Sequence, residues 1–485
     1  MSGTYETRKY GVVAFLGLFI LGLLIARFIA ASRSAIVLSE PIKLDYAGLS
    51  ASVPIGKGWR SEKRWQYREN AFILSSFFES GSGGVTARAR CRYLLAARKA
   101  SADALFEERA SEVGGVIAKT GQTPIGGPEP AFARSSLGGF PGLIDWVQII
   151  KPKTLSDAFV GIAQLPNNRQ LDIEVYQNTG DIDLAESVFE SMAESLKFED
   201  NPFFEAGSEI VSEIKNQGID RFLPSAYPAG PQDAVQSDYR SRESFFLIRD
   251  ARGQSVGFTI EGLAVKAQSV SSASNAKLNI LGASFYYLRR QYDREQLTFF
   301  HSDNSFDEFA WKSQTSGING TSGTEIVMGG DDIITIKKFG AQVSEENYRV
   351  GPAAIPDVLA ELIFDPLLDS GHEKIFVDII EPEGRILPVL ISKAEPRDFA
   401  ADEDVAYVFA VEFLDGQGFS EWLYLDEQRR ISKRLLRHGG IYLIERTSAE
   451  DIATEFPGRA DYILNFPFYQ LQDKFERPLL NGSAE

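Results

Sequence analysis

GVVAFLGLFILGLLIARFIAA, residues 11–31, is the stretch around which the rest of the chain is organised. It contains no acidic residue and a single basic one, Arg27, near its C-terminal end. With a rise of about 1.5 Å per residue, a helix of roughly 20 apolar residues covers the ~30 Å hydrocarbon core of a bilayer. The stretch therefore predicts one transmembrane helix in the cytoplasmic membrane, preceded by a short cytoplasmic tail over residues 1–10.

Two further questions concern how this helix is processed and which way it points. A cleaved signal peptide is the alternative, but the apolar run exceeds the usual h-region of roughly 7–15 residues, which favours a retained signal anchor. Arg8 and Lys9 before the helix nearly balance Arg27, Arg33 and Lys43 at its other end. Because a short tail usually stays in the cytoplasm, we expect the bulk of the chain to be extracytoplasmic, and periplasmic in a bacterium.

Small residues repeat every four positions within the predicted helix, at Gly22, Ala26 and Ala30. Such a ridge lets two membrane helices approach closely, so it predicts a helix–helix contact. The alternative is that Gly and Ala are simply common in membrane helices.

Composition limits the classes of function. Of the 485 residues, 44% are hydrophobic and 24% charged, as in ordinary globular proteins. The net charge of −17 argues against a nucleic-acid partner, because phosphate binding needs a concentrated basic surface. A single cysteine, Cys91, excludes an intrachain disulfide and a thiolate metal cluster.

The sequence contains no recognisable catalytic pattern. His301, His372 and His438 lie far apart, and Gly371-His372-Glu373 lacks the second histidine of a zinc-protease helix. A GxSxG elbow and a phosphate-binding loop are both missing from the chain. We therefore expect no enzymatic activity, no cofactor and no metal site.

Residues 38–199 alternate strand-like segments with two helices. Ser101 is a suitable N-cap for a helix over 102–117. A second helix over 184–196 carries the apolar stripe Leu184, Val188, Met192 and Leu196, typical of a helix packed on a sheet.

These elements resemble the PsbP-like fold. The resemblance is carried by YAGLSASVPIGKGW at 46–59, by ARKASADALFEE at 97–108 and by LAESVFESMAESLKF at 184–198. It implies an antiparallel α/β sandwich and a binding or assembly module attached to a membrane complex. It implies no catalytic residue.

Residues 201–485 predict a long antiparallel meander. Gly253, Gly384, Gly416 and Gly439-Gly440 each lie between two apolar runs, as in hairpin turns. Short turns force neighbouring strands to be antiparallel, and a meander with few helices forms a strongly curved sheet. The segment WLYLDEQRRISKRLLRHGGIYLIERTSAEDIATEFP at 422–457 resembles half-barrel envelope proteins related to lipoprotein carriers. The predicted fold class is thus α+β: a transmembrane helix, a PsbP-like α/β sandwich and a curved β-sheet domain.

Three aromatic doublets lie in predicted strands, at Phe245-Phe246, Tyr286-Tyr287 and Phe299-Phe300. Because neighbours in a strand point to opposite faces, each doublet places an aromatic ring on both sides of the sheet. We expect the second face to be covered by helices or by the first domain; an apolar groove for a ligand is the alternative.

Basic residues form two candidate partner contacts. Arg88, Arg90 and Arg92 alternate along one strand and share a face, with Cys91 on the opposite, buried side. A second set lies on a C-terminal hairpin and consists of Arg429, Arg430, Lys433, Arg434 and Arg437. Each set fits an acidic partner, and an ordinary solvated strand is the alternative for both.

Taken together, these features predict a single-pass membrane protein that acts as a binding or assembly subunit of a membrane-associated complex, with other membrane or envelope proteins as partners. The alternative is a membrane-tethered carrier of a lipid or other apolar ligand, and the third possibility is an enzyme of unknown type.

Overall fold

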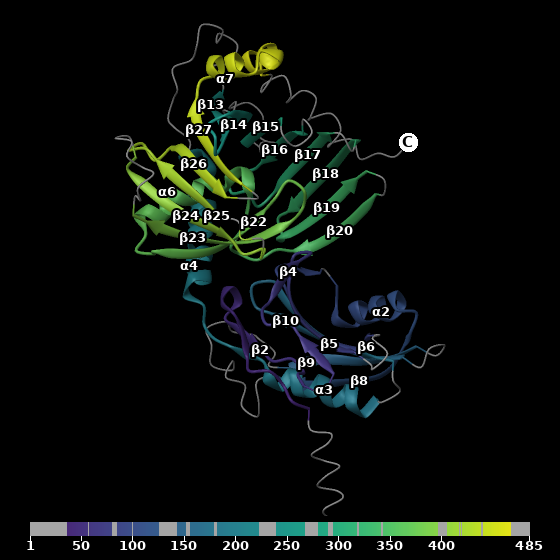
Figure 1. The fold of residues 1–485 in the computed structure, drawn as a ribbon. Helices are drawn as coiled ribbons and strands as arrows, with labels where there is room; N and C mark the ends of the chain where they lie inside the picture. Colours follow the sequence, from purple (N-terminus) through teal and green to yellow (C-terminus); the bar gives the residue numbers. More distant parts are fainter. Residues whose placement is uncertain are drawn as a thin grey trace, which may run out of the picture.

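The computed structural model describes most of the chain between residues 36 and 466. The described ranges are 36–56, 58–79, 85–98, 100–125, 143–151, 156–178, 182–222, 239–266, 280–289, 294–317, 320–340, 343–395, 405–416, 418, 420–437 and 440–466. Within them the chain forms three sheets, of three, eight and sixteen strands. Figure 1 shows the sixteen-stranded sheet curled above the two smaller ones.

The two smaller sheets are built from residues before 200. The three-stranded sheet has the order β1-β2-β12, and the eight-stranded sheet has the order β3-β5-β6-β11-β10-β9-β8, with β4 also paired to β5. Neighbouring strands are antiparallel throughout both sheets. The strands are β1 (Ile42–Leu44), β2 (Leu49–Ala51), β3 (Trp59–Ser61), β4 (Gln66–Arg68), β5 (Ala71–Glu79), β6 (Val85–Leu94), β8 (Val116–Pro124), β9 (Leu143–Lys151), β10 (Ser156–Leu165), β11 (Arg169–Gln177) and β12 (Lys197–Phe198), and the 3-10 turn η1 (Asp45–Ala47) follows β1.

Two helices pack on opposite faces of the eight-stranded sheet. α3 (Ile182–Ser195) buries Val188, Phe189 and Met192 against one face, and α2 (Ala102–Glu112) covers part of the other. Ser101 caps α2 by accepting a hydrogen bond from the Ala104 amide, which confirms the predicted start. The helix ends earlier than predicted, because Gly114 adopts a left-handed φ of 63° and β8 begins two residues later.

The sixteen-stranded sheet has a non-sequential order. It runs β21-β22-β23-β24-β25-β26-β27-β13-β14-β15-β16-β17-β18-β19-β20-β7, and only the β21–β22 pair is parallel. The strands are β7 (Ala97–Arg98), β13 (Tyr239–Asp250), β14 (Ser255–Lys266), β15 (Ile280–Leu288), β16 (Arg294–Ser302), β17 (Phe309–Gly317), β18 (Gly320–Gly329), β19 (Ile333–Phe339), β20 (Ser344–Arg349), β21 (Ala354–Pro356), β22 (Lys374–Ile380), β23 (Ile386–Ala394), β24 (Tyr407–Phe413), β25 (Ser420–Leu425), β26 (Ile431–Arg437) and β27 (Ile441–Thr447).

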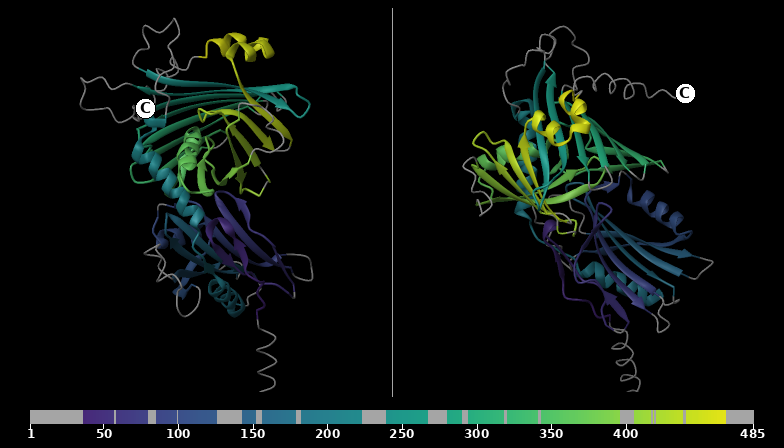
Figure 2. Two further views of the ribbon diagram at one scale, coloured as in Figure 1. Left: turned by 90° about the vertical axis from the view of Figure 1, so that its left-hand side faces the viewer. Right: turned by 45° about the horizontal axis from the view of Figure 1, so that its top comes forward.

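The chain connectivity requires this sheet to curl. β20 and β21 lie near opposite ends of the sheet, yet only residues 350–353 connect them. Fourteen strand spacings of ~4.8 Å would separate the two strands by about 65–70 Å in a flat sheet, whereas the connection spans at most about 18 Å. The two ends are therefore brought close together, and Figure 2 shows the curled form of the sheet from two further directions.

A short helical segment fills much of the inside of the curl. It consists of η4 (Asp357–Ile363) and α6 (Phe364–Asp369), which follow β21 directly. Leu359, Ile363 and Leu367 are fully buried in the same hydrophobic cluster as the inward-facing strand residues. The segment packs the interior of the sheet on one side and borders an internal cavity on the other.

The C-terminal helices cover the outer face of β13–β15. They are α7 (Ala449–Glu455), the 3-10 turn η5 (Pro457–Arg459) and α8 (Ala460–Leu464), and Ser448 with Asp451 forms a capping box at the start of α7. Phe456 packs on Phe258 with ring centroids 5.2 Å apart, and Tyr462 packs on Phe285 at 4.7 Å.

Two of the aromatic doublets illustrate how the two faces differ. Tyr286 lines the cavity inside the curl, while Tyr287 is buried beneath the C-terminal helices. Phe246 belongs to the inner hydrophobic cluster, and Phe245 packs against the outer one. The prediction that helices cover the second face is confirmed here, and the cover comes from the C-terminal end of the same chain.

The parts of the chain before and after residue 200 share one hydrophobic cluster. α4 (Pro202–Gln217) lies against β22, and α5 (Ile219–Phe222) follows it. Tyr46 packs on Phe376 of β22 with ring centroids 5.3 Å apart. The Asn70 side chain accepts a hydrogen bond of 2.8 Å from the Ile386 amide. β7, from the N-terminal part, forms the last strand of the sixteen-stranded sheet, so the two parts also share a sheet.

The predicted fold class, an α+β chain with a transmembrane helix and an α/β sandwich, is wrong. Strands dominate the described residues, in large sheets, and α2 and α3 cover only parts of the eight-stranded sheet rather than forming complete layers. None of the helices in the described ranges is both long enough and apolar enough to cross a membrane. The stretch 11–31, with Gly22, Ala26 and Ala30, lies outside the described residues.

A candidate ligand-binding cavity

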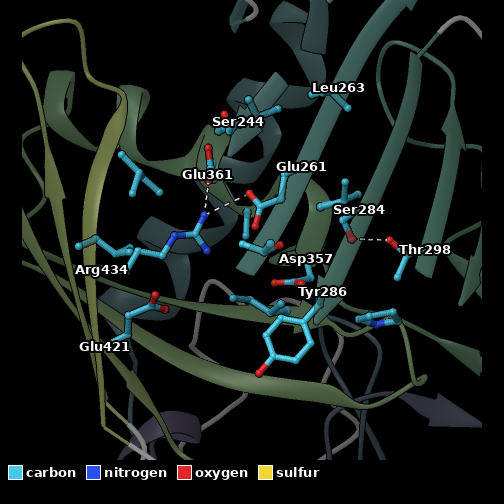
Figure 3. Close-up of a pocket in the computed structure, with 18 of the residues that line it drawn as sticks. Ser244, Glu261, Leu263, Ser284, Tyr286, Thr298, Asp357, Glu361, Glu421 and Arg434 are labelled. Carbon is cyan, nitrogen blue, oxygen red and sulfur yellow. Dashed lines mark hydrogen bonds and ion pairs between the residues drawn. The ribbon is translucent and has the colours of Figure 1, made fainter. Parts of the chain in front are cut away.

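A cavity of about 280 Å³ lies inside the curl of the sixteen-stranded sheet. Its walls come from β13–β17 on one side, from β22–β26 on the other, and from η4 and α6. Figure 3 shows the charged side chains that converge on it from strands distant in the sequence. Clefts and cavities with a few converging polar groups are the usual form of small-molecule sites.

The charged residues reach the cavity because of strand alternation. Glu261 and Leu263 of β14 both line it, as do Glu421 and Leu423 of β25, since alternate residues of a strand share a face. Arg434 of β26 lines the cavity as well. The segment η4 adds two carboxylates from the opposite side, those of Asp357 and Glu361.

Arg434 is the basic residue at the centre of this group. Its Nη2 lies 2.5 Å from an oxygen of Glu361 and 3.3 Å from an oxygen of Glu261 (Figure 3). Its guanidinium carbon lies 5.0 Å from the centre of the Phe246 ring. Burial lowers the pKa of Arg434, but the surrounding carboxylates outweigh this effect and raise it above its ordinary value. Arg434 is therefore fixed as a cation.

The carboxylates outnumber this cation. Burial raises the pKa of Asp357 from 3.8 to about 7, and the nearby charge of Glu261 adds to the shift. Burial likewise raises the pKa of Glu421. Asp357 is nevertheless exposed to solvent, and it lines the cavity. The site holds negative charge that the protein compensates only in part.

The remaining wall is made of hydroxyl and apolar groups. Ser284 and Thr298 form a hydrogen bond of 2.7 Å with each other. Trp311 also lines the cavity and is 2% exposed, and its indole Nε1 has no hydrogen-bond partner in the structure. A buried N–H group without an acceptor is costly, so this donor is suited to a polar atom of a bound molecule.

The arrangement offers binding contacts but no obvious nucleophile or metal centre. Among the described residues, no group of three or more His, Cys, Asp and Glu side chains is placed to hold a metal ion. Cys91 is fully buried in the core of the eight-stranded sheet, as predicted, and burial raises the pKa of its thiol well above the ordinary value.

The first set of predicted contact residues is engaged within the protein. Arg88 and Arg90 of β6 both pair with Glu174 of the neighbouring strand β11, and Arg109 of α2 reaches the same carboxylate at 2.9 Å. Burial opposes ionisation of Glu174, but the three arginines outweigh it and hold its pKa at about 2. Arg92 lies 3.7 Å from Asp172. These ion pairs link α2 to the sheet.

The second predicted set does not form one surface. Arg434 points into the cavity, whereas Lys433 lies 3.8 Å from Glu445 of β27. Arg429 and Arg430, in the turn before β26, lie 2.7 Å from Asp369 and 2.8 Å from Asp426, respectively. Arg437 is exposed at the end of the strand.

Sequence reasoning did not identify the carboxylates of the cavity. Glu261 lies in the apolar run FTIEGLAV and Glu421 in SEWLYL, where each takes an inward position of the strand alternation. A charged residue that shares the inward face of a strand with apolar residues is the sequence pattern that could have predicted such a site. Asp357 and Glu361 carry no comparable signal, because their orientation depends on where η4 packs.

Comparisons with known proteins identify no family. No family model matches the sequence. No curated protein matches it either. Among solved structures, one match is a β-barrel-like protein of the domain of unknown function DUF1849 from Brucella abortus, at 8% identity and a TM-score of 0.30, covering 43% of this chain and 95% of that one. Another is a DUF1089 family protein from Pseudomonas aeruginosa, at 12% identity and a TM-score of 0.19, again covering 43% and 95%. At these TM-scores the similarities support no argument about fold or function, and the resemblances to the PsbP-like fold and to lipoprotein carriers stay predictions.

Proposed function

We propose that this protein is a binding protein and that the cavity inside its curled sheet holds a small molecule. The observation that carries the proposal is the convergence of charged, hydroxyl and indole groups on one cavity of about 280 Å³. Charged groups that converge on one space favour polar contacts there, and a polar or charged ligand supplies such contacts.

A lipid carrier, the alternative, has less support in this cavity. An acyl chain placed there would lie against Glu261, Asp357, Glu421 and Arg434, and it would remove water from charges that it cannot hydrogen-bond. The predicted membrane location and the predicted envelope-protein partners stay predictions. Co-purification in mild detergent tests the partners directly.

The binding role is tested by filling the cavity. Ala360 lies on η4 and lines the space, so Ala360→Trp is expected to occupy it. Val327→Trp is the matched control, because Val327 is exposed on β18 and does not line the cavity. A library of small polar compounds is screened for those that raise the melting temperature of the purified protein.

The expected result is a set of stabilising compounds that act on the natural protein and on Val327→Trp but not on Ala360→Trp. The proposal is overturned if no compound stabilises the protein, or if the same compounds stabilise Ala360→Trp equally. Native mass spectrometry of the freshly purified protein adds an independent measurement, since a retained ligand appears as a defined mass that Ala360→Trp lacks.

A further inference from the structure

We infer that the cavity takes an organic cation, with its ammonium or guanidinium group against Asp357 and Glu421 and its apolar body against the opposite wall. This inference rests on the proposed binding function and names the class of ligand.

The charge balance of the cavity is the first step. Its lining contains four carboxylates, those of Glu261, Asp357, Glu361 and Glu421, against one guanidinium, that of Arg434. The formal charge is thus −4 + 1 = −3 with all carboxylates ionised. Surrounding protein screens such charges less than water does, so an excess of this size favours a bound cation over a neutral or anionic molecule.

The position of Arg434 shows where the uncompensated charge lies. Its Nη2 is shared by Glu261 and Glu361. Within the described ranges, Asp357 and Glu421 form no ion pair and no side-chain hydrogen bond with another residue. These two carboxylates come from η4 and β25, and both face the same space (Figure 3). They are the groups that a ligand cation would meet.

An independent observation indicates that the ligand is an organic molecule with an acceptor atom. Trp311 Nε1 is a buried donor without a partner, and it belongs to the same cavity lining. Leu263 and Phe413 are apolar residues of the same lining. A bare metal ion would leave both the donor and the apolar wall unused, and the described carboxylates are not grouped for metal coordination.

The test uses three ring compounds of the same shape and different charge: cyclohexylammonium, cyclohexanol and cyclohexanecarboxylate. Binding to the full-length protein is measured by titration calorimetry at pH 8. The ammonium compound is expected to bind at least tenfold more tightly than the alcohol, and the carboxylate is expected not to bind.

Two replacements of glutamate by glutamine, on adjacent strands, serve as matched variants. Glu421→Gln keeps the size of the side chain and removes one of the two uncompensated charges, so it is expected to weaken ammonium binding at least tenfold while leaving the alcohol unchanged. Glu412→Gln, at an exposed position of the neighbouring strand β24 that does not line the cavity, is expected to change neither.

The outcomes separate this inference from the proposal on which it rests. If the alcohol or the carboxylate binds as tightly as the ammonium compound, and Ala360→Trp abolishes that binding, the protein binds a ligand in the cavity but the cation preference is wrong. The cation preference is also wrong if the compound library yields only neutral or anionic ligands. If nothing binds and Ala360→Trp behaves as the natural protein does, both are wrong.

Discussion

Asp357 is the residue whose ionisation most directly connects the cavity to stability. The charges of Glu261, Arg434, Glu383 and Glu421 all act on its carboxyl group. Its pKa is about 7 in the folded protein against 3.8 ordinarily, mainly because of burial. As the pH rises from 4 to 7, the unfolded chain releases a proton that the folded protein keeps, so the free energy of unfolding decreases over this range.

Replacing Asp357 by Asn removes this penalty. We expect Asp357→Asn to raise the melting temperature relative to the natural protein, by little at pH 4 and by progressively more up to pH 8, with no further gain at higher pH. Thermal unfolding in a series of buffers measures the difference, with Glu412→Gln as the surface control. A gain that is the same at every pH would show that the effect does not come from ionisation.

A second residue-scale feature is the buried ion pair between the N-terminal part and β22. Arg169 and Asp378 are 2% and 0% exposed and contact each other directly, and Tyr46 bonds to both, with its hydroxyl oxygen 3.0 Å from Arg169 Nη2. Burial raises the pKa of Asp378, while Arg169 and Tyr46 act in the opposite direction. Removing one partner leaves the other charge buried without compensation.

Asp378→Asn is therefore expected to reduce the free energy of unfolding by about 3–5 kcal/mol. Asp45→Asn is the control, because the side chains of Asp45 and Lys43 are 82% and 53% exposed and such pairs contribute at most about 1 kcal/mol. Chemical denaturation measures both. The double replacement Arg169→Met with Asp378→Leu should recover most of the loss; a loss of similar size in the double variant would mean that shape, rather than unpaired charge, is responsible.

At the scale of elements, α4 and β22 approach each other closely at one glycine. A Cβ atom on Gly207 would lie 1.8 Å from the carbonyl oxygen of Phe376, in the backbone of β22. Backbone cannot move aside as a flexible side chain can, so any larger residue must push the helix off the strand. The neighbouring residues Ala206 and Ile210 are buried at the same contact.

Gly207→Ala is expected to destabilise the protein even though alanine favours helix formation by about 1 kcal/mol. The loss of packing should exceed that gain and leave a net loss on the order of 1–3 kcal/mol. Ser208→Ala, one residue further along the same helix and half-buried, is the control and should change stability little. Equal stability of the two variants would mean that α4 can shift along β22 without cost.

At the scale of the whole molecule, the chain before residue 200 supplies part of the support of the large sheet. Tyr46 packs on Phe376, Arg169 pairs with Asp378, and β7 completes one edge of the sheet. α4 joins the two parts along one side of the molecule (Figure 2). The sixteen-stranded sheet is therefore not an independent body with a free surface at this junction.

A fragment over residues 201–485 should accordingly melt at a lower temperature than one over residues 36–485, because it exposes apolar surface and leaves Asp378 without its partners. Calorimetry gives the two melting temperatures, and size-exclusion chromatography reports aggregation. Equal melting temperatures with both fragments monomeric would show that the junction contributes little to the stability of the sheet.

The sequence by itself determined the local features of this protein. The glycines predicted to form hairpin turns do so: Gly253, Gly384 and Gly416 have φ values of 75°, 79° and 76° between consecutive antiparallel strands. Ser101 begins its helix as predicted, and Cys91 is buried. Such features depend on residues only a few positions apart, whose steric and hydrogen-bonding preferences can be read directly.

Only the tertiary structure decided how these pieces combine. β27, the last strand, pairs with β13, the first strand after α5, and this pairing makes one curled sheet out of two meanders. The curl brings Glu261, Asp357, Glu421 and Arg434 around one cavity, although they are spread over more than 170 positions of the chain. Strand alternation fixes which face a residue takes but not which distant strand lies opposite, because that choice depends on the packing of the whole sheet around η4 and α6.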